Sequence, residues 1–164
     1  LHSIFRLFSL DDMRFVFFKG SKPKIVNDHF EWLYKIRNIF QPPLKGYYTS
    51  LFGDRVDPFF HGITFHNGID IKARTGSPIH ASRNGIVSFS GWNEGFGLTI
   101  MIQHRDGYST MYGHCSSIYV KKGDWVTTKD VIGLLGSTGR STGPHLHFSI
   151  MRHGKAKNPL LYIW

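Results

Sequence analysis

The sequence has a single cysteine, Cys115, and contains no apolar run of 18 residues. One cysteine excludes an internal disulfide framework and cysteine-rich zinc ribbons, because both need several thiols. Charged residues interrupt the apolar opening segment at Arg6, Asp11, Asp12 and Arg14, so it predicts neither a membrane-spanning helix nor a signal peptide. Because the chain begins with leucine, we expect it to be a piece of a longer protein, in which any membrane anchor would lie further upstream.

Negative charge is also scarce. The 164 residues include 20 lysines and arginines against 11 aspartates and glutamates, which gives a formal net charge of +9. Such a charge favours a polyanionic partner: nucleic acid, an anionic membrane or an acidic cell-wall polymer. The basic residues are scattered, and neither an arginine-rich helix nor an RNA-binding aromatic motif occurs. We therefore expect no nucleic-acid partner.

A domain boundary is predicted near residue 41. Residues 1–40 are aromatic, basic and poor in glycine, and the apolar positions within 28–40 (DHFEWLYKIRNIF) approximate a helical stripe with Asp28 as its N-cap. Pro42 and Pro43 stop any helix there. We expect residues 1–40 to be a helical and extended segment. It would pack on the back of the domain, lie over its groove as an inhibitor, or offer an aromatic surface to a regulatory protein or homologous subunit.

Residues 41–164 have the pattern of a mainly β domain. Turn-forming clusters rich in glycine, asparagine and proline separate short apolar runs. The runs at 86–92, 98–104, 108–114 and 131–136 predict strands, and HRDGYS at 104–109 predicts a hairpin turn. The length suits one domain with a proper core.

Two histidines occur one residue apart in GPHLHF, residues 143–148. In a strand, successive side chains alternate between faces, so His145 and His147 project to one side while Leu146 and Phe148 project to the other. The apolar pair can pack inward while the two imidazoles share a wall. By itself this spacing also fits two unrelated histidines.

A second cluster lies in FHNGID, where His66 and Asp70 are four residues apart with Gly68 between them. A glycine-kinked turn can aim both side chains at one point. An imidazole and a carboxylate suit zinc, and a histidine from a neighbouring strand would complete three ligands with a fourth position open for water. His114 is either a site histidine or a solvent-facing strand end. A nucleophilic role for Cys115 beside it is disfavoured, because adjacent strand residues point to opposite faces.

Three separated segments carry a family resemblance: TSLFGDRVDPFFHGITFHNGIDI (49–71), YGHCS (112–116) and GSTGRSTGPHLHF (136–148). In order and approximate spacing, residues 46–160 resemble the lysostaphin-like or LytM-type zinc endopeptidases of peptidase family M23. The resemblance implies a compact antiparallel β-sheet domain with a groove over a zinc ion.

Residue by residue, the resemblance implies that His66, Asp70 and His147 bind the zinc. His145 and His114 match the two family histidines that do not bind metal and that handle protons or stabilise the oxyanion, in an order that the sequence leaves open. Arg55 matches an arginine expected to support the site.

One stretch departs from the family pattern. Some relatives have a tyrosine shortly before the first zinc histidine, whereas DPFFHG at 57–62 offers only phenylalanines, which cannot donate a hydrogen bond. Tyr108 or Tyr112 would replace it only if the fold brings either one near.

The implied function is hydrolysis of peptide cross-links in bacterial peptidoglycan, as a D,D-endopeptidase rather than a glycyl-glycine endopeptidase, in the periplasm or outside the cell. The GxRxDP segment at 53–58 resembles the relatives that act in cell shape or division. The alternative is a non-catalytic LytM-type module that binds or activates another cell-wall hydrolase. That alternative predicts lost ligands, and none is missing here.

Overall fold

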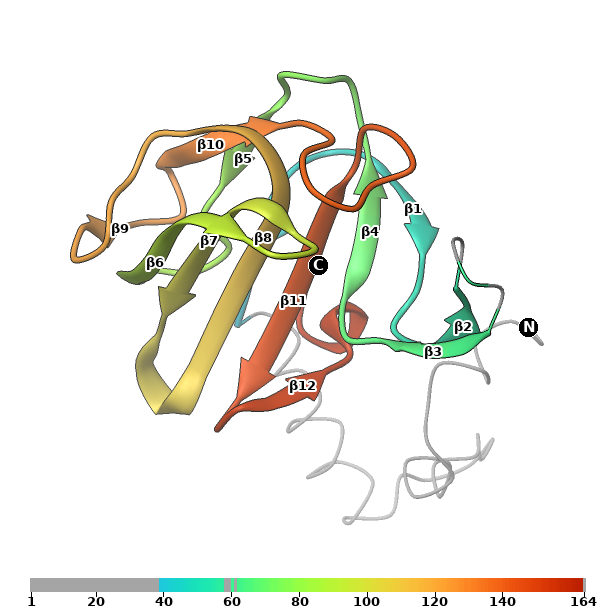
Figure 1. Ribbon diagram of the computed structural model, residues 1–164. Helices are drawn as coiled ribbons and strands as arrows, with labels where there is room; N and C mark the ends of the chain where they lie inside the picture. Colours follow the sequence, from blue (N-terminus) through green and yellow to red (C-terminus); the bar gives the residue numbers. More distant parts are fainter. Residues whose placement is uncertain (1–38, 58–59, 61, 164) are drawn as a thin grey trace, which may run out of the picture. The chain divides into compact units, whose positions relative to one another are not determined.

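The computed structural model describes residues 39–57, 60 and 62–163 (Figure 1). Contacts divide the chain into two units, Leu1–Ile36 and Arg37–Trp164, and all the described residues belong to the second. The helix predicted over residues 28–40, and the roles predicted for residues 1–40, therefore lie outside the described residues except at positions 39 and 40. In the part of the chain that the structure describes, no helix is long and apolar enough to cross a membrane.

The described residues form twelve strands and two short 3₁₀ helices. In chain order they are β1 (Tyr47–Ser50), β2 (Gly53–Val56), β3 (Ile63–His66), β4 (Ile69–Lys72), β5 (Pro78–His80), β6 (Gly85–Asn93), β7 (Gly97–Gln103), η3 (Arg105–Gly107), β8 (Tyr108–Ile118), β9 (Trp125–Val126), β10 (Val131–Leu135), β11 (Leu146–Arg152), β12 (Lys155–Lys157) and η4 (Pro159–Leu161).

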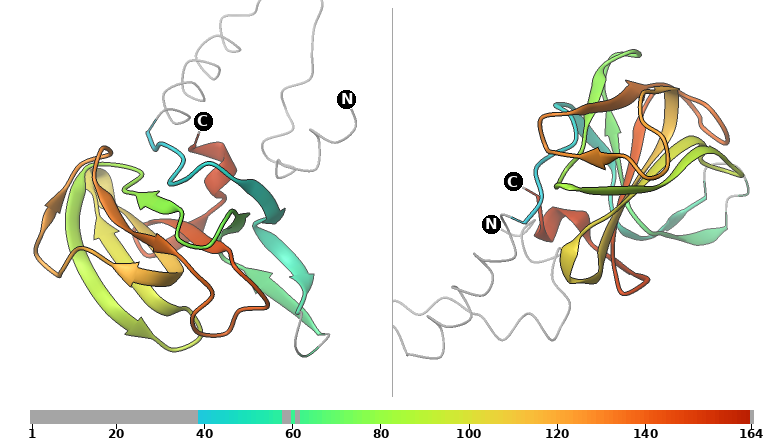
Figure 2. Two further views of the ribbon diagram at one scale, coloured as in Figure 1. Left: turned by 90° about the horizontal axis from the view of Figure 1, so that it is seen from above. Right: turned by 90° about the vertical axis from the view of Figure 1, so that its left-hand side faces the viewer.

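Ten of these strands form one antiparallel sheet in the order β1-β4-β11-β8-β7-β6-β9, with β12 beside β11, β10 beside β8 and β5 beside β10. The two remaining strands, β2 and β3, form a separate antiparallel ribbon. Figure 1 shows this ribbon beyond the β4 side of the sheet, and the views in Figure 2 show how strongly the sheet twists. The predicted mainly antiparallel β fold is confirmed.

Each strand predicted from an apolar run is present. The runs at 86–92, 98–104, 108–114 and 131–136 correspond to β6, β7, β8 and β10, of which β8 continues to Ile118. The predicted hairpin between β7 and β8 turns at η3, where Asp106 and Gly107 both have positive φ, 61° and 71°. A glycine and a short polar residue tolerate this left-handed backbone best.

The core fixes the orientation of the strands that carry the two histidine motifs. Leu146 and Phe148 of β11 are fully buried, as are Ile69 and Ile71 of the neighbouring β4. Burial of one such side chain contributes about 1.5–3 kcal/mol. This apolar face anchors both strands, so that their alternate residues are held on the opposite face of the sheet.

Phe40 attaches the start of the described chain to its end. It forms an isolated parallel bridge with Ile163 and is 2% exposed. Its ring makes edge-on contacts with the rings of His104, Tyr108 and Tyr162 at centroid distances of 5.4–6.4 Å. Phe40, which the predicted boundary assigned to the N-terminal segment, thus packs in the core of the β domain.

Candidate active site and metal centre

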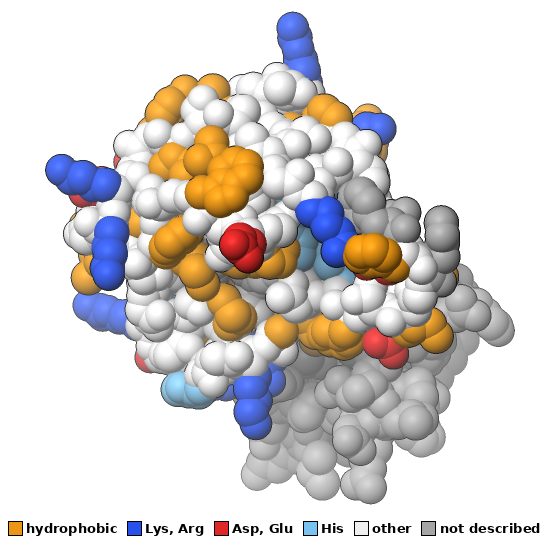
Figure 3. Space-filling model, viewed as in Figure 1, with side chains coloured by type: hydrophobic (Ala, Val, Ile, Leu, Met, Phe, Trp, Pro, Cys, Tyr) orange, Lys and Arg blue, Asp and Glu red, His pale blue; other side chains and the backbone are white. Residues whose placement is uncertain are grey.

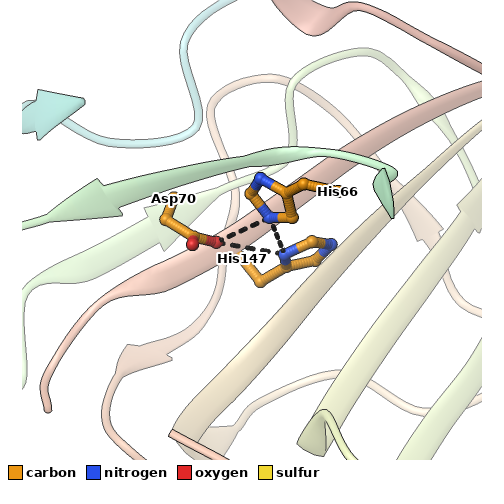
Figure 4. A group of neighbouring side chains, drawn as sticks. All are labelled: His66, Asp70 and His147. Atoms are coloured by element: carbon orange, nitrogen blue, oxygen red, sulfur yellow. Dashed lines mark hydrogen bonds and ion pairs between the residues drawn. The ribbon is translucent and has the colours of Figure 1, made fainter. Parts of the chain in front are cut away.

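Three side chains predicted as ligands converge from three strands (Figure 4). Asp70 on β4 and His147 on β11 are direct cross-strand partners, so their side chains project to the same face. His66 is the last residue of β3, and the short turn at Asn67 and Gly68 brings it back over β4. All three residues are buried.

The turn between His66 and Asp70 requires glycine because the backbone approaches β11 closely. A Cβ atom on Gly68 would lie 2.5 Å from the carbonyl oxygen of Phe148 and 2.9 Å from the Cε1 atom of His147. No side chain fits at those separations. Gly68 therefore allows a four-residue spacing to bring an imidazole and a carboxylate together without a helix.

The three ligand atoms form a nearly equilateral triangle. The Oδ1 atom of Asp70 lies 3.1 Å from the Nε2 atom of His66 and 3.1 Å from the Nδ1 atom of His147, and these two nitrogens are 3.0 Å apart. Ligands arranged tetrahedrally about 2.0 Å from a zinc ion are separated by about 3.3 Å. The triangle is close in size to one face of such a tetrahedron, and these residues form a group able to hold a metal ion.

The hydrogen bonds around the triangle leave lone pairs pointing into it. A neutral imidazole carries one N–H, and His66 donates its Nδ1–H to the carbonyl oxygen of Leu51 at 2.8 Å, which leaves Nε2 as an acceptor. When His147 donates its Nε2–H to the Oγ atom of Ser149 at 2.9 Å, its Nδ1 is an acceptor too. Together with the Asp70 carboxylate, three acceptors then converge with no proton between them. Such a donor set fits a divalent cation.

The protonation states of Asp70 and His147 also suit the binding of a metal ion. Burial alone would raise the pKa of Asp70, but the neighbouring imidazoles of His147 and His66 outweigh it and hold that pKa well below its usual range. Burial lowers the pKa of His147 to about 4, although Asp70 opposes the shift. Near pH 7 the carboxylate is therefore ionised and the imidazole neutral, as metal ligands must be.

His114 and His145 lie together beside the triangle, with ring centroids 4.6 Å apart. His114 donates its Nδ1–H to the carbonyl oxygen of Thr138, and His145 donates its own to that of Gly143, each at 2.7 Å. Both Nε2 atoms are thereby left free to accept a proton, and that of His145 is 3.8 Å from the Oδ1 atom of Asp70. Backbone carbonyls thus orient these rings as they orient His66.

A bulge in β8 places His114 in the site. The register between β7 and β8 shifts between Leu98 and Ile100, and His114 has a positive φ of 62°. Its N–H bonds the carbonyl oxygen of Phe96 at 2.7 Å. Of the two alternatives for His114, a site residue or a solvent-facing strand end, the structure supports the first, because the residue is 5% exposed and lines the cleft.

The neighbouring Cys115 lies in the core instead. Its side chain is fully buried, and its thiol hydrogen-bonds the carbonyl oxygen of Tyr112 at 3.6 Å. Burial raises its pKa to about 12, so the thiol stays protonated at neutral pH. The residue therefore lacks the thiolate that a cysteine nucleophile needs.

Arg55 on β2 reaches from the ribbon to the triangle formed by the ligand atoms of His66, Asp70 and His147. Its Nη1 atom donates to the Oδ2 atom of Asp70 at 2.8 Å and to the Oγ atom of Ser50. Ser50 is the cross-strand partner of Asp70 on β1. The guanidinium thus holds the carboxylate by the oxygen that does not face the two histidines.

Several groups that shape the site were not predicted from the sequence. The ring of Phe96 lies 4.8 Å from that of His147 and 6.0 Å from that of His114. Ser149 follows His147 by two residues, and strand alternation would have placed it on the same face. The carbonyls that orient the rings carry no side-chain signal, so no sequence pattern reveals them.

Neither tyrosine considered as a replacement oxyanion donor is near the site. The hydroxyl of Tyr112 bonds the backbone N–H of Ser82 at 2.8 Å and the hydroxyl of Thr110 at 3.0 Å, deep in the core. Tyr108 packs against Phe40. In the described part of the chain, neither residue lines the cleft.

The site lies in an open cleft of about 740 Å³. One wall comes from the β2–β3 ribbon and the other from the loop between β10 and β11, and the ion pair between Asp57 and Arg140, at 2.6 Å, joins the two. Figure 3 shows histidine side chains recessed in a hollow on this face. The space is adequate for a segment of extended peptide.

Comparison with known proteins identifies relatives of this domain. DD-carboxypeptidase/endopeptidase Mpg of Neisseria meningitidis is 43% identical over 112 residues, which are 68% of this chain and 26% of that protein. Peptidoglycan DD-endopeptidase ShyA of Vibrio cholerae is 39% identical over 106 residues, 65% of this chain and 25% of that protein. The chain thus spans about a quarter of the length of these curated relatives.

The fold is also that of a solved peptidase. The crystal structure of a zinc-containing peptidase from Vibrio cholerae superposes with a TM-score of 0.70 and 32% sequence identity, over 76% of this chain and 40% of that one. The model of the family described as peptidase family M23 matches residues 64–159. That range includes all five clustered histidine and aspartate residues of the cleft, and by this match the chain belongs to peptidase family M23.

Proposed function

We propose that this domain is a zinc-dependent endopeptidase that hydrolyses the peptide cross-links of bacterial peptidoglycan. The observation that carries the proposal is the complete set of three converging ligand side chains with two further oriented histidines in one cleft. Relatives named DD-carboxypeptidase/endopeptidase and peptidoglycan DD-endopeptidase favour the D,D cross-link over a glycine bridge.

His66, Asp70 and His147 would hold the zinc ion. Bound zinc supplies a Lewis acid that polarises the scissile carbonyl and lowers the pKa of a bound water to about 7. His145 and His114 handle the protons. Because both rings carry their proton on Nδ1, each can take up a second proton at Nε2 and then donate it to the leaving amine or to the oxyanion.

The competing proposal is a non-catalytic module that binds or activates another wall hydrolase. A binding module does not need both the ligands and the proton-handling pair in working geometry. Here the carbonyls of Leu51, Thr138 and Gly143 hold three of the rings in one protonation pattern. This arrangement supports catalysis.

The substrate places the protein in the bacterial cell envelope, periplasmic or extracellular. The net charge of +9 suits an anionic wall polymer, since opposite charge raises the local concentration of enzyme on its substrate.

The test separates ligands from proton-handling residues. Alanine at His66, Asp70 or His147 removes both bound zinc and activity, whereas His145→Ala or His114→Ala keeps zinc and loses turnover by at least about 100-fold. Zinc is measured by elemental analysis, and activity by digesting muropeptides and identifying the new termini by mass spectrometry.

His80→Ala is the matched control, because His80 lies on β5 and does not line the cleft. Full zinc occupancy in the Asp70→Ala protein would contradict the ligand assignment. Activity that survives 1,10-phenanthroline would contradict the metal mechanism.

A further inference from the structure

Lys72 lies on the same face of the sheet as the three candidate metal ligands. It is the last residue of β4, two positions after Asp70, so the two side chains project to the same side. Asp70 pairs with His147 and Ile71 with Leu146 across β4 and β11. Continued by one position, this register brings Lys72 next to His145, and Lys72 lines the cleft.

The charges in the cleft leave Lys72 uncompensated. Two arginines and two aspartates also line it, and they form two pairs: Arg55 with Asp70 at 2.8 Å and Arg140 with Asp57 at 2.6 Å. Among the described residues, the ammonium of Lys72 has no ion-pair or hydrogen-bond partner. In the described lining, the cleft therefore carries one net positive charge besides its histidines, on a residue whose strand position adjoins that of His145.

We infer that Lys72 binds a carboxylate of the substrate peptide close to the bond that is cut, and that it makes the enzyme select acidic cross-links. This inference rests on the proposed function and names the substrate class of that site. Two strand positions span about 7 Å, and each residue of an extended peptide spans about 3.3–3.6 Å. The carboxylate recognised by Lys72 thus lies within about two residues of the scissile bond.

Peptidoglycan cross-links made through diaminopimelate fit this requirement chemically. The diamino acid carries a free carboxylate on the carbon next to the scissile amide nitrogen. Converting this carboxylate to an amide removes the charge and changes little else, so the two forms of one cross-linked dimer make a matched pair of probes.

The experiment compares the zinc-loaded wild type with Lys72→Met, which removes the charge and keeps an unbranched side chain, and Lys72→Arg, which keeps the charge. Lys122→Met is the control, because Lys122 is exposed and does not line the cleft. Each protein is assayed for kcat and KM on the free-acid and the amidated dimer. The Kd of each dimer is measured separately in proteins that combine each Lys72 or Lys122 substitution with His114→Ala. The second change is expected to stop cleavage of the dimers during the binding measurement.

For the free-acid dimer, Lys72→Met is expected to raise KM and Kd about fivefold with kcat little changed, as for the loss of one solvent-accessible ion pair. The amidated dimer is expected to be unaffected, and both Lys72→Arg and Lys122→Met to resemble the wild type. The wild-type preference for the free acid is expected to weaken with added salt.

Equal affinity of the wild type for the two dimers, or equal losses on both in Lys72→Met, would overturn the inference. If the wild type binds the dimers but cuts neither, the proposed function fails, while the difference in binding still decides the role of Lys72. A wild type that binds neither form overturns the inference as well.

Discussion

At the scale of single residues, the site depends most on Asp70, whose carboxylate contacts four charged or titratable side chains: His66, His145, His147 and Arg55. Its Oδ1 atom faces His66 and His147, and its Oδ2 atom accepts from Arg55. A carboxylate held by both oxygens cannot rotate away from the metal position. We therefore propose Arg55 as a positioning residue of the site, although it cannot bind a cation itself.

Replacing Arg55 with methionine is expected to weaken zinc binding by about 10–100-fold, the usual effect of losing a partner that orients a metal ligand. Competition with a chromogenic chelator measures this affinity. Arg74→Met removes an exposed arginine that does not line the cleft and is expected to bind zinc like the wild type. Unchanged zinc affinity in Arg55→Met would show that Asp70 needs no such support.

His104 gives the domain a pH-dependent stability that is separate from its chemistry. Its side chain bonds the carbonyl oxygen of Asn84 and the hydroxyl of Thr110, and burial lowers its pKa from 6.5 to about 4. Between these values the unfolded chain binds a proton that the folded chain does not. The free energy of unfolding therefore falls as pH falls from about 6.5 to about 4, by up to about 3 kcal/mol from this residue.

The His104→Gln variant cannot take up this proton and is expected to lose less stability on acidification than the wild type. Urea unfolding at pH 7 and at pH 4.5 measures the difference, with His80→Gln as control. The same acid-induced loss in His104→Gln and in wild type would assign the effect to other groups.

At the scale of elements, the strands were predictable and the bulge was not. Alternation in GPHLHF predicted that Leu146 and Phe148 face the core while the two histidines lie on the opposite face of the strand. It could do so because apolar and polar residues alternate along a strand that has one buried face. His114 enters the cleft through an extra residue in β8, and an insertion of this kind leaves no apolar pattern. The carbonyls of Leu51 and Thr138 depend on the paths of loops, which side-chain periodicity does not report.

The approach of the β3–β4 turn to β11 is testable at Gly68. In Gly68→Ala the new methyl group meets backbone and ligand atoms at 2.5–2.9 Å, so β4 must move away from β11 and the triangle must open. We expect a loss of about 1–3 kcal/mol in stability, as for overpacking, together with weaker zinc binding.

Gly62→Ala is the matched control for this change, because a Cβ atom there meets no atom within 4 Å. Thermal unfolding and chelator competition measure the two effects. Wild-type zinc affinity in Gly68→Ala would mean that the turn adapts without moving the ligands.

At the scale of the whole molecule, we expect the fold not to depend on the proposed metal. Asp70 and His147 lie on strands that already pair with each other and that bury Ile69, Ile71, Leu146 and Phe148 beneath them. Small zinc domains, which lack such a core, unfold when the metal is removed. Here a metal that binds only the folded state raises stability by mass action alone.

Chelation is therefore expected to lower the melting temperature while leaving the far-ultraviolet circular dichroism at 25 °C unchanged. The His147→Ala protein should show no shift on chelation, because it has lost a ligand. Unfolding of the wild type at 25 °C by chelator would instead mean that the sheet needs the metal.

The left-handed backbone of His114 is a local cost to stability at a residue that is proposed to handle protons in catalysis. A non-glycine residue held in that region costs about 1–3 kcal/mol, and glycine at the same position would avoid most of it. Glycine would also lose the buried contacts of the imidazole, including its hydrogen bond to the carbonyl oxygen of Thr138. A search for stabilising changes that weighs backbone strain alone would select glycine at position 114 and leave the cleft without this histidine, so such a search should keep that position fixed.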